Sequence, residues 1–428
     1  MARFDTFFVM TPPDVAAFAA ERLRLFEPGA ALEVTEIGDG NLNYVFRVVD
    51  RRSGRSVIVK QAGPTARVSD AFKVSPDRSR IEHEALRLQG ELAPGLVPAV
   101  HGHDPVLQAT VMEDLSDHVI LRRALLAGRA PPRLADDLST FLARTLLLTS
   151  DAAVDHKEKR RRAARFVNPD LCEITEDLVF TEPFNDLRGR NDAFPATLPF
   201  VRSELYEDPR VRLETAKLKF EFLEHGQSLI HGDLHTGSIF VRDDSTKVID
   251  AEFACHGPAG FDLGMLAANL VFAWANAQAT IEEPAERDRR CGWLARTLAE
   301  VVDGFVEKWQ QLWDSQVVEP TARYPGFAEW YLGGVLRDAA GAAGVELCRR
   351  TVGFAKVADL TGIGDVSSRA SAERLCIALG KRLILERWGV RSGRDYLMRL
   401  DGAAALHPVL GPARGEHAVR AARGEARP

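Results

Sequence analysis

The chain has 428 residues, 46% of them hydrophobic, and a formal net charge of −6 at pH 7. This length suffices for a large core and favours two or three domains, while the acidic balance argues against a dedicated nucleic-acid binder. No apolar run reaches membrane-spanning length, and residues 1–14 lack the pattern of a signal peptide, so we expect a cytoplasmic protein. The five cysteines include no Cys-x-x-Cys pair, which indicates reduced thiols rather than disulfides or a zinc site.

The N-terminal region predicts a short helix followed by an antiparallel sheet. Residues 11–14 carry a cap and proline signal for a helix start, and residues 32–37, 44–49 and 56–61 are short β-rich runs. The turn at 38–43 contains two glycines, which let backbone amides approach a phosphate closely. An ordinary β-turn would use the same residues. The candidate nucleotide contacts in this turn are Gly40, Asn41, Leu42 and Asn43.

Lys60 ends an apolar strand, a position from which a lysine can reach nucleotide phosphates. An exposed and inert lysine is the ordinary alternative. The next predicted helix starts at residues 75–77 and places apolar residues at 81, 85, 88 and 92. Glu84 falls beside that stripe and Glu82 points away from it, so we expect Lys60 to pair with Glu84, with Glu82 as the alternative.

Residues 110–116 form a strand that breaks into an acidic turn, and a hinge between two lobes would lie there. Its backbone groups would bind an adenine ring, with Met112 or Leu115 covering the ring and Glu113 between them. A plain strand end is the alternative. After this segment the pattern is helical, over residues 134–148, 211–225, 261–277 and 285–313.

Residues 229–252 read LIHGDLHTGSIFVRDDSTKVIDAE and carry the most specific signal. Asp233 lies in a turn between two apolar runs, and Asp250 follows 17 positions later, at the end of a second strand. This is the order of parts in a kinase active site. Asp233 would be the base that faces a substrate hydroxyl, and Asp250 would hold Mg²⁺ on the nucleotide phosphates.

Two departures from the protein-kinase pattern compensate each other. Ser238 stands where a metal-binding Asn is usual and is a weaker ligand. Glu252 follows Asp250 by two positions, and in an extended segment the two side chains would face the same side, so that Glu252 restores the missing charge. A solvated loop residue is the alternative for Glu252.

These parts predict an α+β, two-lobed, protein-kinase-like fold. The expected divisions are a small β-rich N-lobe at 1–115, a larger and mainly α C-lobe at 116–410, and a disordered tail at 411–428. Asp262 is expected to brace the catalytic loop through backbone hydrogen bonds rather than to touch substrate. The role of His235, beside the base, stays open.

The chain resembles the 5-methylthioribose kinases, small-molecule kinases of the aminoglycoside-phosphotransferase and choline-kinase type, from about Asp14 to Leu397. The motifs that carry the resemblance are GDGNLNYVFRV (38–48), HGDLHTGSI (231–239), DAEFACHGPAGFDLG (250–264) and, more specifically, NPDLCEITEDLVFTEPF (168–184) and CRRTVGFAKVADL (348–360). The resemblance implies transfer of the ATP γ-phosphate to the 1-hydroxyl of S-methyl-5-thioribose, a step of methionine salvage. It also implies that Asp250 and Glu252 hold Mg²⁺ and that Arg349 and Arg350 contact the sugar.

Alternatives remain at this point. The loop after Lys60 lacks the tryptophan common in the family and Ala251 replaces the usual proline, so a related pentose such as 5-deoxyribose is the second candidate substrate. The further alternatives for the function are another aminoglycoside or choline-type phosphotransferase and a noncatalytic nucleotide-binding scaffold. From helix geometry alone, Arg349 and Arg350 would point about 100° apart and face solvent. The expected partners are ATP and a small sugar, without nucleic acid or membrane, and a homodimer fits because dimers occur among the relatives.

Overall fold

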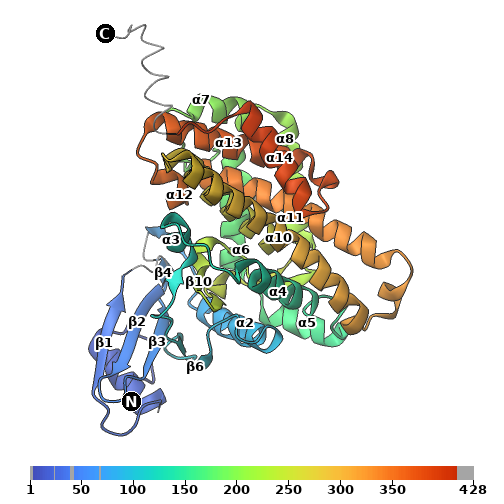
Figure 1. The fold of residues 1–428 in the computed structure, drawn as a ribbon. Coiled ribbons are helices and arrows are strands. Elements are labelled where there is room, and N and C mark those ends of the chain that lie inside the picture. The colour runs from blue at the N-terminus through green and yellow to red at the C-terminus, as the bar shows by residue number, and fades with distance from the viewer. Residues whose placement is uncertain (1–2, 24, 39–42, 67–68, 412–428) are drawn as a thin grey trace, which may run out of the picture.

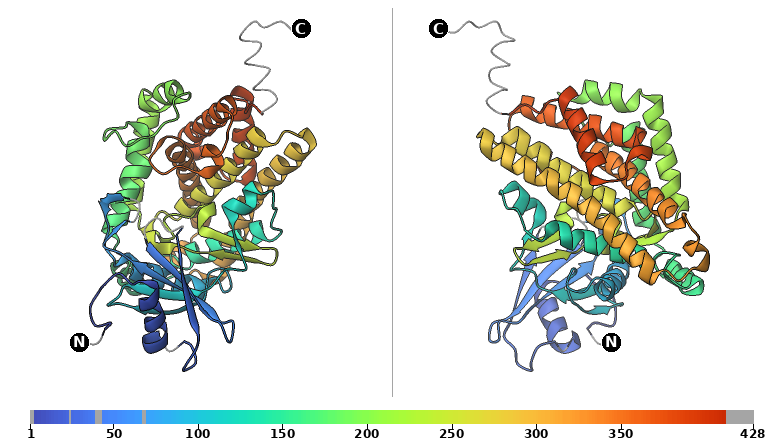
Figure 2. Two further views of the ribbon diagram at one scale, coloured as in Figure 1. Left: turned by 90° about the vertical axis from the view of Figure 1, so that its left-hand side faces the viewer. Right: turned by 45° about the vertical axis from the view of Figure 1, so that its right-hand side comes forward.

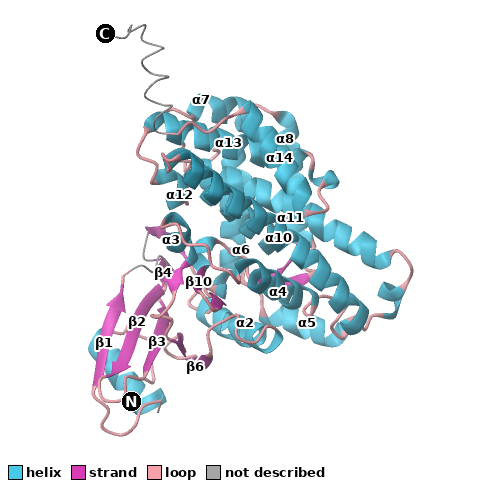
Figure 3. Cartoon of the chain, viewed as in Figure 1, coloured by secondary structure: helices cyan, strands magenta, loops and turns pink. Residues whose placement is uncertain are grey.

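The computed structural model describes residues 3–23, 25–38, 43–66 and 69–411. A small β-rich lobe lies at one end of the molecule and a larger helical lobe makes up the rest (Figures 1 and 3), which confirms the predicted two-lobed fold. The expected phosphate-turn residues Gly40, Asn41 and Leu42 and the expected tail from residue 412 onward lie outside the described residues.

The small lobe is built on a five-stranded antiparallel sheet with the order β1-β2-β3-β7-β6. Its apolar face packs against helix α1 (Pro12–Phe18), which begins with a capping box between Thr11 and Asp14. The strands β1 (Leu32–Ile37), β2 (Asn43–Asp50), β3 (Ser56–Ala62) and β7 (Ala109–Glu113) lie at the predicted places. Strand β6 (Val100–Asp104) and the separate two-stranded ribbon of β4 (Thr65–Ala66) and β5 (Ser69–Lys73) were not predicted from the sequence.

Helix α2 (Arg78–Leu92) follows the ribbon in the chain, yet its apolar face belongs to the core of the large lobe. Ile81, Ala85 and Leu86 are almost fully buried there, together with Met112 from strand β7. Helix α2 therefore ties the sheet to the helical lobe, and its side chains lie at the junction of the two.

The large lobe is mainly α-helical, as predicted, and the long helix α10 runs diagonally across it (Figure 2). Helices α9 and α11 pack closely because Gly264 of α9 has no side chain, and a Cβ there would lie 2.3 Å from the carbonyl oxygen of Ala339. The helices are α3 (Leu121–Leu126), α4 (Leu134–Leu147), α5 (His156–Arg165), α6 (Pro169–Thr175), α7 (Leu198–Val201), α8 (Pro209–Glu224), α9 (Phe261–Thr280), α10 (Pro284–Gln316), α11 (Phe327–Val352), α12 (Ala358–Thr361), α13 (Val366–Leu385) and α14 (Gly393–Leu406).

Two small sheets at the base of the large lobe hold the loops that carry the predicted catalytic residues. Their strands are β9 (Ser228–Ile230) with β12 (Cys255–Gly257), and β8 (Val119–Ile120) with β10 (Ile239–Arg242) and β11 (Ser245–Val248). All five cysteines are free thiols, as predicted. Among the helices that the structure describes, none is long and apolar enough to cross a membrane.

Candidate active site

The catalytic loop starts where strand β9 ends and is fixed by the buried carboxylate of Asp262 at the start of α9. Its Oδ2 accepts the backbone N–H of His231 at 2.6 Å, and its Oδ1 accepts that of Gly232 at 3.0 Å. Gly232 has a φ of +85°, and a Cβ there would lie 2.5 Å from the carbonyl oxygen of Phe253. Only glycine fits such a position, and the predicted bracing role of Asp262 is confirmed.

A hairpin sets Asp233 and Asp250 relative to each other. Strands β10 and β11 pair directly, and beyond them the N–H of Ile249 donates to the carbonyl oxygen of Ser238 at 3.0 Å. The ring of His231 adds a second link, because its Nε2 contacts the carbonyl oxygen of Ile249 at 2.7 Å while its Nδ1 accepts the N–H of Asp233. These hydrogen bonds therefore fix the segments that carry Asp233 and Asp250 relative to each other.

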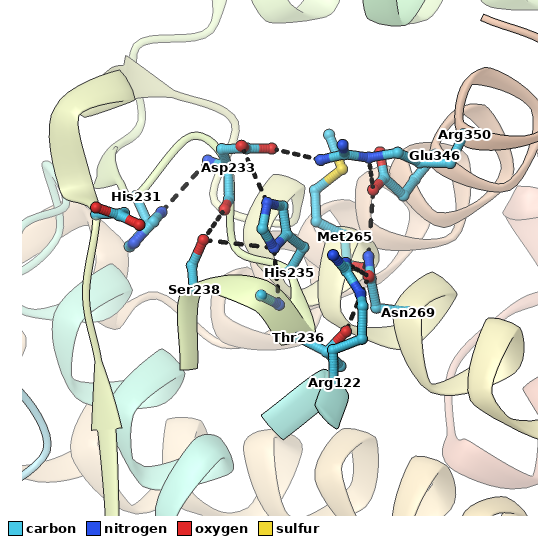
Figure 4. A network of polar contacts seen from close by, with 12 residues as sticks. Arg122, His231, Asp233, His235, Thr236, Ser238, Met265, Asn269, Glu346 and Arg350 are labelled. Atoms are coloured by element: carbon cyan, nitrogen blue, oxygen red, sulfur yellow. Dashed lines mark hydrogen bonds and ion pairs between the residues drawn. The ribbon is translucent and has the colours of Figure 1, made fainter. Parts of the chain in front are cut away.

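Both arginines at the end of helix α11 converge on Asp233 (Figure 4 shows Arg350). Nη2 of Arg349 and Nη2 of Arg350 each donate to Oδ1 of Asp233 at 3.1 Å. The two arginines are 8% and 7% exposed, so the solvent-facing orientation expected from helix geometry alone is wrong. The site thus joins an acid that can face a hydroxyl with two planar cations that suit a hydroxyl-rich or phosphorylated ligand.

Asp233 is held as a carboxylate. Burial by itself would raise its pKa, but the contact with His235 and the charges of Arg350 and Arg349 outweigh burial and hold the pKa well below its usual range. His235 accepts the N–H of Gly237 at Nδ1 at 2.9 Å, which leaves Nε2 to carry the proton, 3.4 Å from Oδ2 of Asp233. Burial lowers the pKa of His235, and the ring contacts Oδ2 of Asp233 while the two arginines contact Oδ1.

The predicted pairing of Lys60 with Glu84 is wrong, and the alternative, Glu82, is the partner. Nζ of Lys60 lies 2.7 Å from Oε1 of Glu82 and also contacts Asp250, whereas Glu84 pairs with Arg80 and Arg165. Although burial lowers the pKa of Lys60, the charges of Asp250 and Glu82 raise it overall, so the ammonium stays charged.

Replacement of Glu82 with Gln is expected to lower kcat/KM for ATP about 10- to 100-fold, because a buried charged hydrogen bond contributes about 1.5–3 kcal/mol. Glu84→Gln provides the matched control on the same helix and should stay within about twofold of the parent. Steady-state kinetics with ATP varied check both variants. Equal kinetics of the two would mean that Lys60 needs no helix partner.

Asp250 and Glu252 do not lie in an extended segment, so the predicted i, i+2 geometry is wrong. Asp250 has a left-handed backbone conformation with φ of +65°, and residues Ala251–Phe253 form a 3₁₀ turn. Glu252 is nevertheless not a solvated loop residue, because it is 7% exposed and its Oε2 accepts the amide of Asn43 at 2.9 Å and lies 3.3 Å from Arg78.

The donor set fits Mg²⁺ bound together with a nucleotide. In the described part of the chain no three or more His, Cys, Asp or Glu side chains gather into a metal cluster. A nucleotide-bound Mg²⁺ needs only one or two carboxylates besides phosphates and water. The side chain of Asp250 is 42% exposed, and the side-chain contacts of Glu252 with other described residues fall on Oε2, so its Oε1 can serve a metal. Ser238 is buried, with its hydroxyl 3.3 Å from the carbonyl oxygen of Asp233.

The residues predicted to form the hinge lie at the junction of the lobes. Met112 is 6% and Leu115 is 7% exposed, and Met112 packs into the core of the large lobe. The N–H of Glu113 donates to the carbonyl oxygen of Ala99, and its carboxylate accepts the N–H of Ala99 and pairs with Lys247. Glu113 therefore fastens strand β7 to its neighbours, and contacts of this segment with adenine remain a prediction.

Several polar residues of the site were missed from the sequence. Arg78 holds Glu252, and Glu346 of α11 accepts both Arg349 and Arg350. Asn269 and Arg122 extend this network to Asp359, and Figure 4 shows them beneath the catalytic loop. Only Glu346 had a signal in the sequence, since it precedes the two arginines by three and four residues, the spacing of helical ion pairs.

Comparison with known proteins assigns the family. Residues 33–286 match the model of the phosphotransferase enzyme family. A methylthioribose kinase of Geobacillus kaustophilus (strain HTA426) is 45% identical over 392 residues, which cover 91% of this chain and 96% of that protein. A methylthioribose kinase of Cronobacter sakazakii (strain ATCC BAA-894) is 38% identical over 404 residues, 94% of this chain and 99% of that protein.

Among solved structures, a Plasmodium vivax ethanolamine kinase aligns over 93% of this chain and 90% of its own, with 12% identity and a TM-score of 0.43. The family assignment depends on the sequence matches: the phosphotransferase family model covers residues 33–286, and the two methylthioribose kinases match more than 90% of the chain. The chain belongs to the methylthioribose kinase family, within the phosphotransferase enzyme family.

Proposed function

We propose that this kinase transfers the γ-phosphate of ATP to the 1-hydroxyl of S-methyl-5-thioribose, with Mg²⁺ as cofactor, in methionine salvage. The observation that carries the proposal is the convergence of Arg349 and Arg350 on Asp233, within a chain 38–45% identical to methylthioribose kinases over most of its length. Two buried guanidinium groups suit a neutral sugar with several hydroxyls, and they disfavour a polycationic aminoglycoside.

The proposed reaction forms a bond between the sugar oxygen and the γ-phosphorus and breaks the bond from that phosphorus to the β,γ-bridging oxygen, releasing ADP. Asp233 accepts the hydroxyl proton. Its depressed pKa makes it a weak base, so it first orients the hydroxyl and takes the proton as the new bond forms. Arg349 and Arg350 donate to the sugar and offset negative charge on the moving phosphoryl group.

The nucleotide end of the site is assigned to Lys60, Asp250 and Glu252. Lys60, fixed by Glu82, would contact the α and β phosphates, and Asp250 with Glu252 would hold Mg²⁺. Mg²⁺ supplies charge neutralisation on the phosphate oxygens. Of the proposed nucleotide contacts at 40–43, Asn43 is the one that the structure describes, and it donates to Glu252.

A substrate panel tests the proposal. The purified protein is incubated with ATP and Mg²⁺ and one acceptor among methylthioribose, ribose, 5-deoxyribose, choline and kanamycin, and ADP and the phosphorylated product are both quantified. We expect the highest kcat/KM with methylthioribose and a product phosphorylated at position 1. A higher kcat/KM with 5-deoxyribose would make 5-deoxyribose the assigned substrate. Turnover of choline or kanamycin alone would overturn the proposal.

Replacement of either Arg349 or Arg350 with Ala is expected to raise the KM for the sugar about tenfold or more, because each loses a charged hydrogen bond of about 1.5–3 kcal/mol. The affinity for ATP should stay within about threefold, since neither side chain belongs to the nucleotide end. Arg337→Ala is the matched control, because Arg337 lies on the same helix but pairs with Asp338. Kinetics with the sugar varied at saturating ATP, with ATP binding by calorimetry, check this, and normal sugar kinetics in both variants would remove the arginines from the sugar site.

A further inference from the structure

The convergence of two adjacent arginines on one oxygen needs an explanation. Successive residues of an α-helix project about 100° apart, so the side chains of Arg349 and Arg350 leave helix α11 in different directions. Both Nη2 atoms are nevertheless 3.1 Å from Oδ1 of Asp233. The end of the helix does not change these directions, because α11 continues through both arginines to Val352.

Glu346 binds both arginine side chains and holds them close together. It precedes Arg349 by three residues and Arg350 by four, so it lies between them on the preceding turn of the helix. Its Oε2 accepts Nε of Arg349, and its Oε1 accepts Nε of Arg350 at 3.0 Å. One carboxylate thus uses one oxygen for each guanidinium group.

The carboxylate of Glu346 is itself fixed and paired. Glu346 is 0% exposed, and Nδ2 of Asn269 on helix α9 donates to its Oε1 at 3.2 Å. Oδ1 of the same Asn269 accepts from Arg122 at 3.1 Å and lies 3.3 Å from the hydroxyl of Thr236 in the catalytic loop. The position of the carboxylate is therefore tied to that of the loop, as Figure 4 shows.

The charges of this cluster balance within a buried space. Asp233 and Glu346 carry two negative charges, and Arg349 and Arg350 carry two positive ones. Removal of the Glu346 charge leaves two buried cations with one carboxylate, and each guanidinium group loses its partner at Nε. Glu346 contacts Nε, whereas Asp233 contacts Nη2, so the hold of Glu346 can persist when an incoming sugar replaces the contacts at Nη2.

We propose that Glu346 is a positioning residue for phosphoryl transfer, whose carboxylate aims Arg349 and Arg350 at the acceptor sugar beside Asp233. Glu346 does not touch the substrate and acts through the two arginines. This inference deepens the proposed function and rests on it.

Double-mutant cycles test the inference. Glu346→Gln is combined with Arg349→Ala and, separately, with Arg350→Ala, and kcat and KM for the sugar are measured with ATP affinity and thermal unfolding. We expect Glu346→Gln alone to lower sugar kcat/KM about tenfold or more, with ATP affinity within about threefold. In either arginine variant, Glu346→Gln should lower kcat/KM by a factor at least about fivefold smaller than in the parent, because the effects of residues that act together are not additive. Multiplicative losses in both cycles would overturn the proposal.

Asp338→Asn is the matched control, since Asp338 is a buried carboxylate two turns earlier on the same helix whose partner is Arg337. It should lower the unfolding temperature and leave sugar kinetics unchanged. Should Glu346→Gln alone not fold, the charge-matched pair Glu346→Gln with Arg349→Gln is compared with Arg349→Gln, and equal sugar kinetics of these two would overturn the proposal. If the parent does not use methylthioribose, the proposed function fails, and the same cycles are run with the acceptor that the panel identifies.

Discussion

Asp233→Asn is expected to lower kcat about 10²- to 10⁴-fold, the usual cost of losing a general base. The asparagine keeps the size of the side chain but removes the charge that faces Arg349 and Arg350 and the atom that takes the hydroxyl proton. ATP affinity should stay within about threefold, because the proposed nucleotide end consists of Lys60 and Asp250, which contact each other. Single-turnover kinetics with the sugar, together with calorimetry for ATP, give the two readouts.

The pH dependence of the parent adds a check on this role. The pKa of Asp233 lies well below its ordinary value of 3.8, so the carboxylate stays ionised as the pH falls and is protonated only below that value. Its contribution to activity is therefore present throughout about pH 5–8 and is lost only in strong acid. A profile of kcat/KM against pH with an acid limb near pH 6 that disappears in Asp233→Asn would contradict the assignment, as would a variant with most of its activity left.

The strands at 32–37, 44–49 and 56–61, the helices at 134–148, 211–225, 261–277 and 285–313 and the catalytic loop could be predicted because their signals are local. Alternating burial in β2, the proline and cap at α1 and the His-Gly-Asp order at 231–233 each depend on a few neighbouring residues. The bracing of the loop by Asp262 followed from the same logic, since a carboxylate at the start of a buried helix needs donors.

The partner of Lys60 could not be chosen from local periodicity. The spacing of Ile81, Ala85, Leu88 and Leu92 placed Glu84 near the apolar stripe, but Leu88 and Leu92 are only half-buried. The buried face instead runs through Ile81, Ala85, Leu86 and Gln89, and it includes Glu82. The choice was made by tertiary packing of α2 on the large lobe, because a carboxylate on that face is stable only beside the Lys60 ammonium.

The environment of the proposed metal ligands and of the arginine pair was also set by distant parts of the chain. Glu252 is held by Arg78 and Asn43, which come from α2 and β2. The two arginines contact Asp233, which lies more than 100 residues earlier in the chain, and Glu346 holds their side chains in place. No local sequence pattern indicates either arrangement. Helix periodicity alone therefore predicted arginines that face solvent, and an extended strand was expected at Asp250 and Glu252.

Asp250→Asn is expected to lower kcat about 100-fold or more. Asp250 contacts Lys60 and is the most exposed of the proposed Mg²⁺ ligands, and a phosphate-bound metal ion contributes several kcal/mol to transition-state charge stabilisation. Asp244→Asn is the matched control, because Asp244 lies in the turn of the same hairpin, is well exposed and pairs only with Arg242 among the described contacts. The control should keep parental kcat.

Glu252→Gln separates metal binding from structural support at the same centre. If Oε1 of Glu252 binds Mg²⁺, the concentration of Mg²⁺ that gives half-maximal activity rises, and kcat falls less than in Asp250→Asn because Asp250 remains. Loss of the charge opposite Arg78 also lowers the unfolding temperature, whether or not Glu252 binds metal. Mg²⁺ titrations and thermal unfolding therefore answer different questions: an unchanged titration with a lowered unfolding temperature would leave Asp250 as the protein's metal carboxylate and make Glu252 the counterion of Arg78.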